Sequence, residues 1–200
     1  MPGTLDFWFD FASTYSYLTA IRIRPLAATA GVTVRFRPFL LGPIFKAQGW
    51  DTSPFNVYPA KGRHMWRDLE RICDALKLAF RRPAPFPQPS LLAARVASVG
   101  LDDVWGKDFC LAVFRAEFAD GAPIGEPATM RAILADLKVD PERTMAAAQS
   151  AAIKQRLRSQ TAEAQRLEIF GAPTFTTADG ELFWGNDRLE DAIGWAQRAG

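Results

Sequence analysis

The segment Thr4–Leu18, TLDFWFDFASTYSYL, decides the architecture of the chain. An apolar side chain stands at every second position from Leu5 to Phe11, which is the period of a β-strand with one apolar face. The alternation stops at Ser13, whose hydroxyl suits a helix start because it accepts a hydrogen bond from an unpaired backbone N–H. We therefore expect a strand that leads directly into a helix. The positive end of that helix stabilises an anion such as a thiolate, carboxylate or phosphate.

Strand patterns also occur directly after this helix and again near the C-terminus. The helix is expected to run to about Ala30, and residues 32–39, VTVRFRPF, alternate as a second strand. Strand, helix and strand form a right-handed βαβ unit with parallel strands. Thr174–Thr177 and Glu181–Trp184 flank the hairpin signal Asp179–Gly180, and a final helix follows.

The middle of the chain carries helical patterns without a strand signal. Residues 40–59 are rich in glycine and proline and predict a long irregular loop, a type of segment that is often functional. Helices are then expected over about residues 60–79, 90–99, 102–119, 126–137, a short stretch from 141, and 150–169. The element order predicts an α/β protein with a thioredoxin-like fold, in which residues 1–40 and 168–200 build a four-stranded mixed sheet. Residues 41–167 would form a large all-helical insertion.

Composition excludes several classes of protein. The chain has 200 residues, 48% of them hydrophobic and 23% charged, which is enough for a substantial core. A net charge of +2 predicts neither nucleic-acid binding nor attraction to an anionic membrane. No apolar run approaches the roughly 20 residues that span a bilayer. The N-terminal segment does not resemble a signal peptide, so we expect a cytoplasmic protein.

The sulfur and imidazole groups are few. Cys73 and Cys110 lie far apart among apolar helical neighbours, without the paired spacing of a redox motif. We expect both to be buried, unreactive thiols. With the single His64 they do not give the ligand spacing of a zinc site, so no metal is expected.

Three motifs carry a resemblance to a known enzyme family: FDFASTYSYL at 9–18, NVYPAKGRHMWRDLER at 56–71, and FGAPTF with ELFWGNDRL near the C-terminus. They resemble the 2-hydroxychromene-2-carboxylate isomerase family. This family is the glutathione-dependent branch of the DsbA disulfide-oxidase group and is similar to kappa-class glutathione transferases. The resemblance extends over essentially the whole chain.

The resemblance implies a thioredoxin-like fold, glutathione as cofactor, and a small aromatic carboxylate as substrate. The implied reaction converts 2-hydroxychromene-2-carboxylate to trans-o-hydroxybenzylidenepyruvate in the breakdown of aromatic hydrocarbons. Related proteins are commonly dimers, so a homodimer is implied as well.

Ser13 lies where the family has its active-site serine, and this chain has no cysteine at that helix start. We hypothesise that glutathione brings the sulfur and that the Ser13 hydroxyl and the helix end hold it as a thiolate. The thiolate would add reversibly to the chromene. Without the resemblance, Ser13 reads as a simple helix cap. The family usually has proline where this chain has Thr14, whose hydroxyl can change the hydrogen bonding of the thiol or substitute for Ser13.

The resemblance also implies glutathione contacts near the C-terminus. Ala172–Pro173 matches a loop in which a cis-proline exposes the preceding backbone to the cysteinyl part of glutathione. Residues 184–187 match the segment that holds the γ-glutamyl end. The plainer interpretations are a proline at a strand entry and ordinary helix capping. The predicted cofactor-binding residues are Ser13, Ala172, Pro173, Trp184, Gly185, Asn186 and Asp187.

The predicted substrate contacts are Lys46, Asn56, Lys61 and Phe86. Asn56 matches a substrate-contacting asparagine of the family, and Lys61 at the next helix start would attract the substrate carboxylate. A solvated charged surface explains Arg63 more simply. Phe45, Lys46, Trp50 and Phe86 either line an aromatic pocket or belong to the core.

Two other functions stay open at this point. A kappa-like glutathione transferase would conjugate small electrophiles and keep the sulfur adduct. A non-catalytic thioredoxin-like binding module would have no affinity for glutathione, because a fold alone does not determine function. A disulfide oxidase is disfavoured since the helix start lacks a cysteine.

Overall fold

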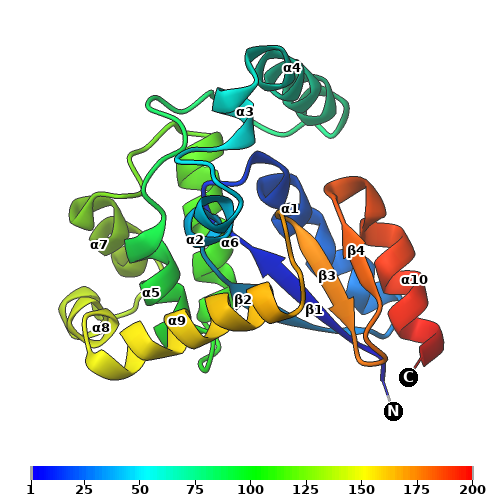
Figure 1. Cartoon of the computed structure of the whole chain (residues 1–200). Coiled ribbons are helices and arrows are strands. Elements are labelled where there is room, and N and C mark those ends of the chain that lie inside the picture. The colour runs from blue at the N-terminus through cyan, green and yellow to red at the C-terminus, as the bar shows by residue number, and fades with distance from the viewer. Residues whose placement is uncertain (1, 200) are drawn as a thin grey trace.

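The computed structural model describes residues 2–199, and a four-stranded sheet lies at its centre (Figure 1). The strands are β1 (Thr4–Phe9), β2 (Thr33–Pro38), β3 (Thr174–Thr177) and β4 (Leu182–Trp184), in the spatial order β2-β1-β3-β4. β1 pairs parallel with β2 and antiparallel with β3, and β3 pairs antiparallel with β4. The predicted mixed sheet, built from the two ends of the chain, is confirmed.

β1 is buried on both faces, which corrects the expectation of one apolar and one polar face. Its Phe7 and Phe9 belong to the main core, and Trp8 on the other face belongs to a second cluster with Phe39. Asp6 shares the face of Trp8 and is also buried, at 9% exposure. Its carboxylate is paired with the two arginines of β2 at 2.7 and 2.9 Å. A polar residue is therefore no sign of solvent exposure in this central strand.

Two helices cover the face of the sheet that carries the main core. α1 (Thr14–Thr29) begins directly after β1, as predicted, and α10 (Leu189–Ala199) contacts both α1 and β1. A short 3-10 helix, η1 (Asn186–Arg188), precedes α10. Because β1 is antiparallel to β3, its C-terminal end lies beside the start of β3. This arrangement brings the start of α1 next to the loop that enters β3.

The expected helices between the two parts of the sheet are present, with shifted bounds. They are α4 (Pro59–Ala75), α5 (Leu91–Gly100), α6 (Gly106–Phe118), α7 (Pro127–Asp136), α8 (Pro141–Ala148) and α9 (Ala151–Arg166). In Figure 1, α5 to α9 gather on one side of the sheet, while α4 lies at the top, above α1. The helical insertion is thus confirmed. Its boundaries at residues 40 and 168 stay a prediction.

The prediction of an irregular segment over residues 40–59 is wrong in part. It contains two short helices, α2 (Leu41–Ala47) and α3 (Pro54–Val57). Pro54 is the first residue of α3, a position that tolerates proline because its missing N–H would have no partner there. The Ser53 hydroxyl caps this turn by accepting the Phe55 N–H at 3.3 Å.

The sheet and the helical insertion share one core. Phe9 of β1 packs on Phe114 of α6 with 5.7 Å between ring centroids, and Tyr17 of α1 packs on Phe118 at 5.5 Å. Among residues 2–199, no helix combines the length and the apolar character that a membrane span requires.

Candidate active site

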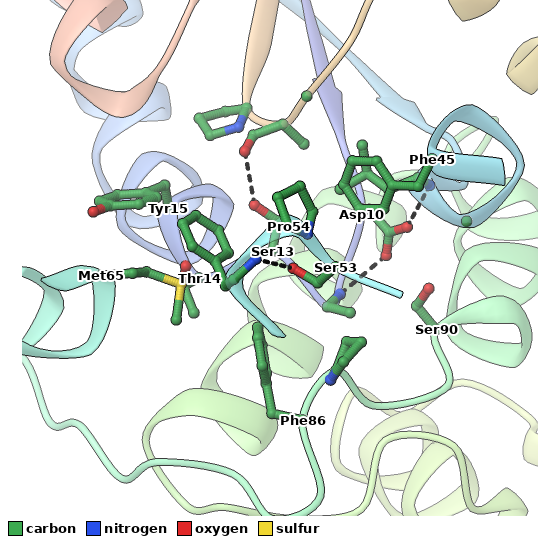
Figure 2. A pocket seen from close by; sticks show the side chains of 18 of the residues that line it. Asp10, Ser13, Thr14, Tyr15, Phe45, Ser53, Pro54, Met65, Phe86 and Ser90 are labelled. Carbon is green, nitrogen blue, oxygen red and sulfur yellow. Dashed lines mark hydrogen bonds between the residues drawn. The ribbon is translucent and has the colours of Figure 1, made fainter. Parts of the chain in front are cut away.

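A cavity of about 950 Å³ opens where β1 ends and α1 begins (Figure 2). Its walls come from the β1–α1 junction, the α2–α3 segment, α4, the proline-rich link around Phe86, and residues 170–173 with 184–188. This volume falls within the range of about 300–1,000 Å³ that is typical of small-molecule sites. The fold therefore brings distant parts of the chain to one site of suitable size.

The N-terminus of α1 forms part of the cavity wall. The backbone N–H groups of Thr14 and Tyr15 have no hydrogen-bond acceptor among residues 2–199. Together with the helix dipole, equivalent to about half a positive charge, these groups favour an anion. The predicted anion-binding helix start thus has free donors.

The Ser13 hydroxyl connects this helix start to the opposite wall. It donates a hydrogen bond to the carbonyl oxygen of Ala172 at 2.9 Å (Figure 2), and it accepts the N–H of Ser16 at 3.3 Å. The capping interpretation is correct for this structure, and a second bond to a distant loop is added to it. In this arrangement the single hydroxyl proton of Ser13 is already donated.

The loop before β3 has the backbone form that the resemblance implies. The Ala172–Pro173 peptide is cis. The Pro173 carbonyl accepts the Gly185 N–H at 3.0 Å, and the Thr174 hydroxyl donates to the Gly171 carbonyl at 2.9 Å. The N–H of Ala172 has no acceptor among residues 2–199, and Ala172 lines the cavity. A peptide ligand would find one free backbone donor here.

Residues 184–187 all line the cavity, but they differ in exposure. Trp184 is 49% exposed, and the centroid of its ring lies 4.9 Å from the ring centroid of Phe170. Asn186 is buried, and its Oδ1 accepts hydrogen bonds from Thr19 and Arg22 of α1, both at 3.2 Å. Asp187 is exposed. Asn186 therefore holds η1 against α1, and Asp187 keeps its carboxylate available for a ligand.

The structure brings two of the four predicted substrate residues to the cavity. Lys61 and Phe86 line it, whereas Lys46 and Asn56 do not. Lys46 is exposed on α2. The Asn56 amide nitrogen donates to Thr52 at 3.1 Å and to the Phe86 carbonyl at 3.3 Å, so it braces the proline-rich link. Lys46 and Asn56 therefore lie outside the cavity wall, and their contact with a substrate stays a prediction.

The predicted aromatic wall is present. Phe45 and Trp50 line the cavity with 6.0 Å between their ring centroids, and Phe86 packs edge-to-face with Trp66 at a centroid distance of 4.7 Å. Of the two interpretations of these rings, the pocket wall is correct for Phe45, Trp50 and Phe86.

Sequence reasoning missed Asp10. This residue lines the cavity although it is only 4% exposed, and its carboxylate accepts the N–H groups of Ala12 at 3.0 Å and Leu41 at 2.8 Å. Burial raises the pKa of Asp10, and hydrogen bonds from Leu41, Ser90 and Ala12 oppose that rise. Asp10 thus ties the β1–α1 junction to the start of α2. The residues that bury Asp10 are distant in the sequence, so no local sequence pattern could identify it as a site residue.

A second buried acid lies deeper. Glu117 of α6 is fully buried, and neither carboxyl oxygen has a hydrogen-bond partner among residues 2–199. Burial raises its pKa well above the ordinary value, and the negative charge of Asp10 raises it further. Its spacing in the sequence was a usable signal: Cys110, Val113, Phe114 and Glu117 recur at helical spacing and so share one face of α6.

Tyr15 also escaped notice. Its hydroxyl donates to the Asp68 carboxylate of α4 at 2.9 Å, and both residues line the cavity. Burial, followed by the hydrogen bond to Asp68, raises the pKa of Tyr15. The phenol therefore stays protonated and links α1 to α4.

The two cysteines are buried, as predicted. Burial raises the pKa of Cys73 to about 11 and also raises the pKa of Cys110. Neither thiol lines the cavity. Within residues 2–199, no three His, Cys, Asp or Glu side chains are grouped in a way that could hold a metal ion.

Comparison with known proteins identifies the family. A family model described as "DSBA-like thioredoxin domain" matches residues 4–192. The chain belongs to the DsbA-like thioredoxin family. Within that family it belongs with the 2-hydroxychromene-2-carboxylate isomerases: it is 30% identical to the isomerase of that name from Pseudomonas putida over 202 residues, which cover 95% of this chain and 94% of the relative.

Two further matches agree with this assignment. The chain is 28% identical to "Glutathione s-transferase kappa 2" of Caenorhabditis elegans, over 94% of this chain and 90% of that protein. A solved 2-hydroxychromene-2-carboxylate isomerase superposes with a TM-score of 0.86 at 27% identity, covering 98% of this chain and 97% of the other. The resemblance read from the sequence motifs is confirmed.

Proposed function

We propose that this chain is a glutathione-dependent isomerase that converts 2-hydroxychromene-2-carboxylate to trans-o-hydroxybenzylidenepyruvate. One observation carries the proposal. Three backbone N–H groups, those of Thr14, Tyr15 and Ala172, lack acceptors among residues 2–199 and belong to residues that line one cavity, whose lining contains no cysteine. These N–H groups can donate to a thiolate and to a peptide backbone, but the cavity wall itself supplies no thiol. This combination suits a peptide ligand that brings its own thiol, as glutathione does.

The same wall offers contacts along the length of glutathione. The Ala172 N–H would donate to a carbonyl of the cysteinyl portion. The exposed carboxylate of Asp187 suits the γ-glutamyl ammonium group, and the half-exposed Trp184 ring gives an apolar cover. With the tripeptide held in this way, its sulfur reaches the N-terminus of α1, where the positive helix end lowers a thiol pKa.

The thiolate would act as a reversible nucleophile. The ring C–O bond of the chromene hemiketal breaks as the proton of its 2-hydroxyl passes to the ring oxygen, which leaves a phenol and a cis-configured conjugated ketone. The thiolate then forms a sulfur–carbon bond at the alkene carbon next to the aromatic ring, and the displaced electron pair is delocalised toward the ketone as an enolate. The former double bond can then rotate in the ring-opened molecule. When the sulfur–carbon bond breaks, the double bond returns in the trans arrangement and the thiolate is regenerated, so neither redox change nor net transfer occurs.

The opposite wall suits the aromatic carboxylate. Phe45, Trp50 and Phe86 present flat apolar surfaces, and the Lys61 ammonium group supplies a positive charge for the carboxylate. Lys61 lies 5.9 Å from the ring centroid of Phe55, so the cation stands beside an aromatic surface. Small-molecule sites commonly combine an apolar wall with a few polar groups in this way.

A kappa-like glutathione transferase is the second candidate, favoured by the similarity to the kappa transferase of Caenorhabditis elegans. A non-catalytic binding module is the third. The first two functions need reduced glutathione, which the cytoplasm supplies, and we propose that the chain works there. Pairing into a homodimer stays a prediction.

Two measurements distinguish these functions. Calorimetric titration with reduced glutathione should give saturable binding, and the chromene substrate should then change its absorbance spectrum while all glutathione is recovered. A stable glutathione adduct would assign the transferase function instead. An absence of glutathione binding would contradict both enzymes and favour the binding module.

A further inference from the structure

We propose that the hydroxyl of Thr14, rather than that of Ser13, donates the hydrogen bond that holds the glutathione sulfur as a thiolate. This inference rests on the proposed function and assigns the donor within the same site. It follows from how the two neighbouring hydroxyls are used in the structure.

The Ser13 hydroxyl is fully engaged. Its one proton is donated to the Ala172 carbonyl at 2.9 Å, and its oxygen accepts the Ser16 N–H at 3.3 Å. To serve a sulfur, Ser13 would have to release the Ala172 carbonyl. That release would break the link between the helix start and the loop whose N–H is expected to hold the tripeptide. Ser13 is therefore a positioning residue, which aligns two walls of the site.

The Thr14 hydroxyl is available. Thr14 is only 2% exposed, it lines the cavity, and no hydrogen bond joins its hydroxyl to any of residues 2–199. Ser16 gives an informative contrast, because its unpartnered hydroxyl is sealed from solvent and Ser16 is no part of the cavity wall. The Thr14 oxygen is not sealed in this way, so its free donor reaches the space that a ligand would fill.

The surroundings of Thr14 complete the donor set. Its own N–H and that of Tyr15 are free at the first turn of α1, and Figure 2 shows Thr14 between Tyr15 and Met65 at the cavity. Several donors to the charged form of a group lower the pKa of that group. The other titratable or charged residues of the cavity are Asp10 from β1–α1, Asp51 from the α2–α3 segment, Lys61, His64 and Asp68 from α4, and Asp187 and Arg188 from η1.

Valine and serine replacements at Thr14 separate the hydroxyl from the shape of the side chain. Thr14→Val keeps the branched shape and removes the donor, whereas Thr14→Ser keeps the donor. Thr29→Val makes the same change at the exposed far end of α1 and is the matched control. Ser13→Ala tests the positioning role.

The readout is the ultraviolet absorbance of the thiolate as a function of pH, with each variant saturated with reduced glutathione. We expect Thr14→Val to raise the pKa of the bound thiol by about one unit, a tenfold loss of ionisation. Thr14→Ser should restore the low pKa, and Thr29→Val should match the wild type. Ser13→Ala should weaken glutathione binding and lower Tm by roughly 2–4 °C through loss of the cap, with the thiol pKa kept low.

Two results would overturn the inference. If Thr14→Val keeps the wild-type thiol pKa while Ser13→Ala raises it, Ser13 is the donor and the proposed function stands. If the wild type bound to glutathione shows no low-pKa thiolate at all, the inference and the proposed function fall together.

Discussion

The two halves of the cavity differ in how their residues are held. One half, residues 12–15 with 171–173 and 184–187, consists mostly of buried and half-buried residues and is cross-linked by hydrogen bonds, including the bond from Ser13 to Ala172. We call it the anchored half. The open half, residues 41–61 with Phe86, consists mainly of exposed or half-buried side chains on short helices and loops.

This difference suits two different tasks. A reacting sulfur must be held within a fraction of an ångström of the productive position, which requires a rigid support. Recognition of a flat aromatic substrate tolerates more movement, and loops commonly supply it. We therefore expect changes in the anchored half to affect glutathione binding, and changes in the open half to affect only the aromatic substrate.

The largest effect is expected at Gly185 of the anchored half. Its φ is +112°, and an added Cβ would lie 2.4 Å from Oδ1 of Asp187. Backbone strain of this kind costs about 1–3 kcal/mol. The free variant would relieve it by moving residues 184–187 away from the binding conformation, so Gly185→Ala should weaken glutathione binding by roughly tenfold to a hundredfold. Calorimetry measures this loss. The control is Gly42→Ala in the open half, where an added Cβ meets nothing within 4 Å. Equal affinities of the two variants for glutathione would show that the anchored half is no more important for glutathione binding than the open half.

The next largest effect is expected on the free energy of unfolding, at the buried residue Glu117. Glu117→Met removes a buried carboxyl without partners and should raise the free energy of unfolding by about 1–3 kcal/mol near neutral pH. Because burial raises the pKa of Glu117, the folded chain keeps a proton that the unfolded chain releases above pH 4.5. The stability of the wild type therefore falls as pH rises above that value.

Urea unfolding at several pH values tests this prediction. The advantage of Glu117→Met should grow between about pH 5 and pH 8, since the variant no longer has the titrating group. A variant that is less stable than the wild type at every pH would mean that Glu117 has an unrecognised stabilising role.

Replacement of Phe86 in the open half should affect turnover of the aromatic substrate and not the binding of glutathione, the opposite of the effect expected at Gly185. Its ring packs on Trp66 and lines the cavity. Loss of an aromatic contact costs about 0.5–1.5 kcal/mol, so Phe86→Ala should lower kcat/KM for the chromene about threefold to tenfold. The Kd for glutathione should not change. A large loss of glutathione affinity would show that the two halves are not independent.

The smallest effect is expected at Lys61. An exposed ion pair contributes about 0.2–1 kcal/mol, so Lys61→Ala should raise KM for the aromatic carboxylate about twofold to fivefold and leave kcat nearly unchanged. Lys46→Ala is the matched control, because Lys46 is an exposed lysine of the same region that does not line the cavity. An equal rise of KM in both variants would indicate general attraction rather than a specific contact.

The same contrast explains what the sequence could predict. The passage from β1 into α1 was predictable because period, cap and turn all lie within one short segment, and Ser13 caps α1 as expected. The α2–α3 segment was not predictable, because its glycine and proline content indicates an irregular loop, although Pro43 and Pro54 both lie in first helical turns, where proline is tolerated.

Side-chain direction was the other limit. In a loop, spacing does not tell which side of the chain meets a cavity, so the sequence pattern does not distinguish Lys46 and Asn56, which lie outside the cavity wall, from Lys61, which lines it. Asp10 was missed since its partners Leu41 and Ser90 are far along the chain. Local patterns thus predicted the elements, and contacts between distant segments decided the details of the site.

The most direct test of the whole account is a crystal structure with reduced glutathione bound. We predict the sulfur at the N-terminus of α1, within about 3.5 Å of the Thr14 hydroxyl or of the free N–H groups beside it, and the tripeptide backbone paired with the Ala172 N–H. A sulfur that lies against the open half, or a tripeptide bound outside this cavity, would contradict it.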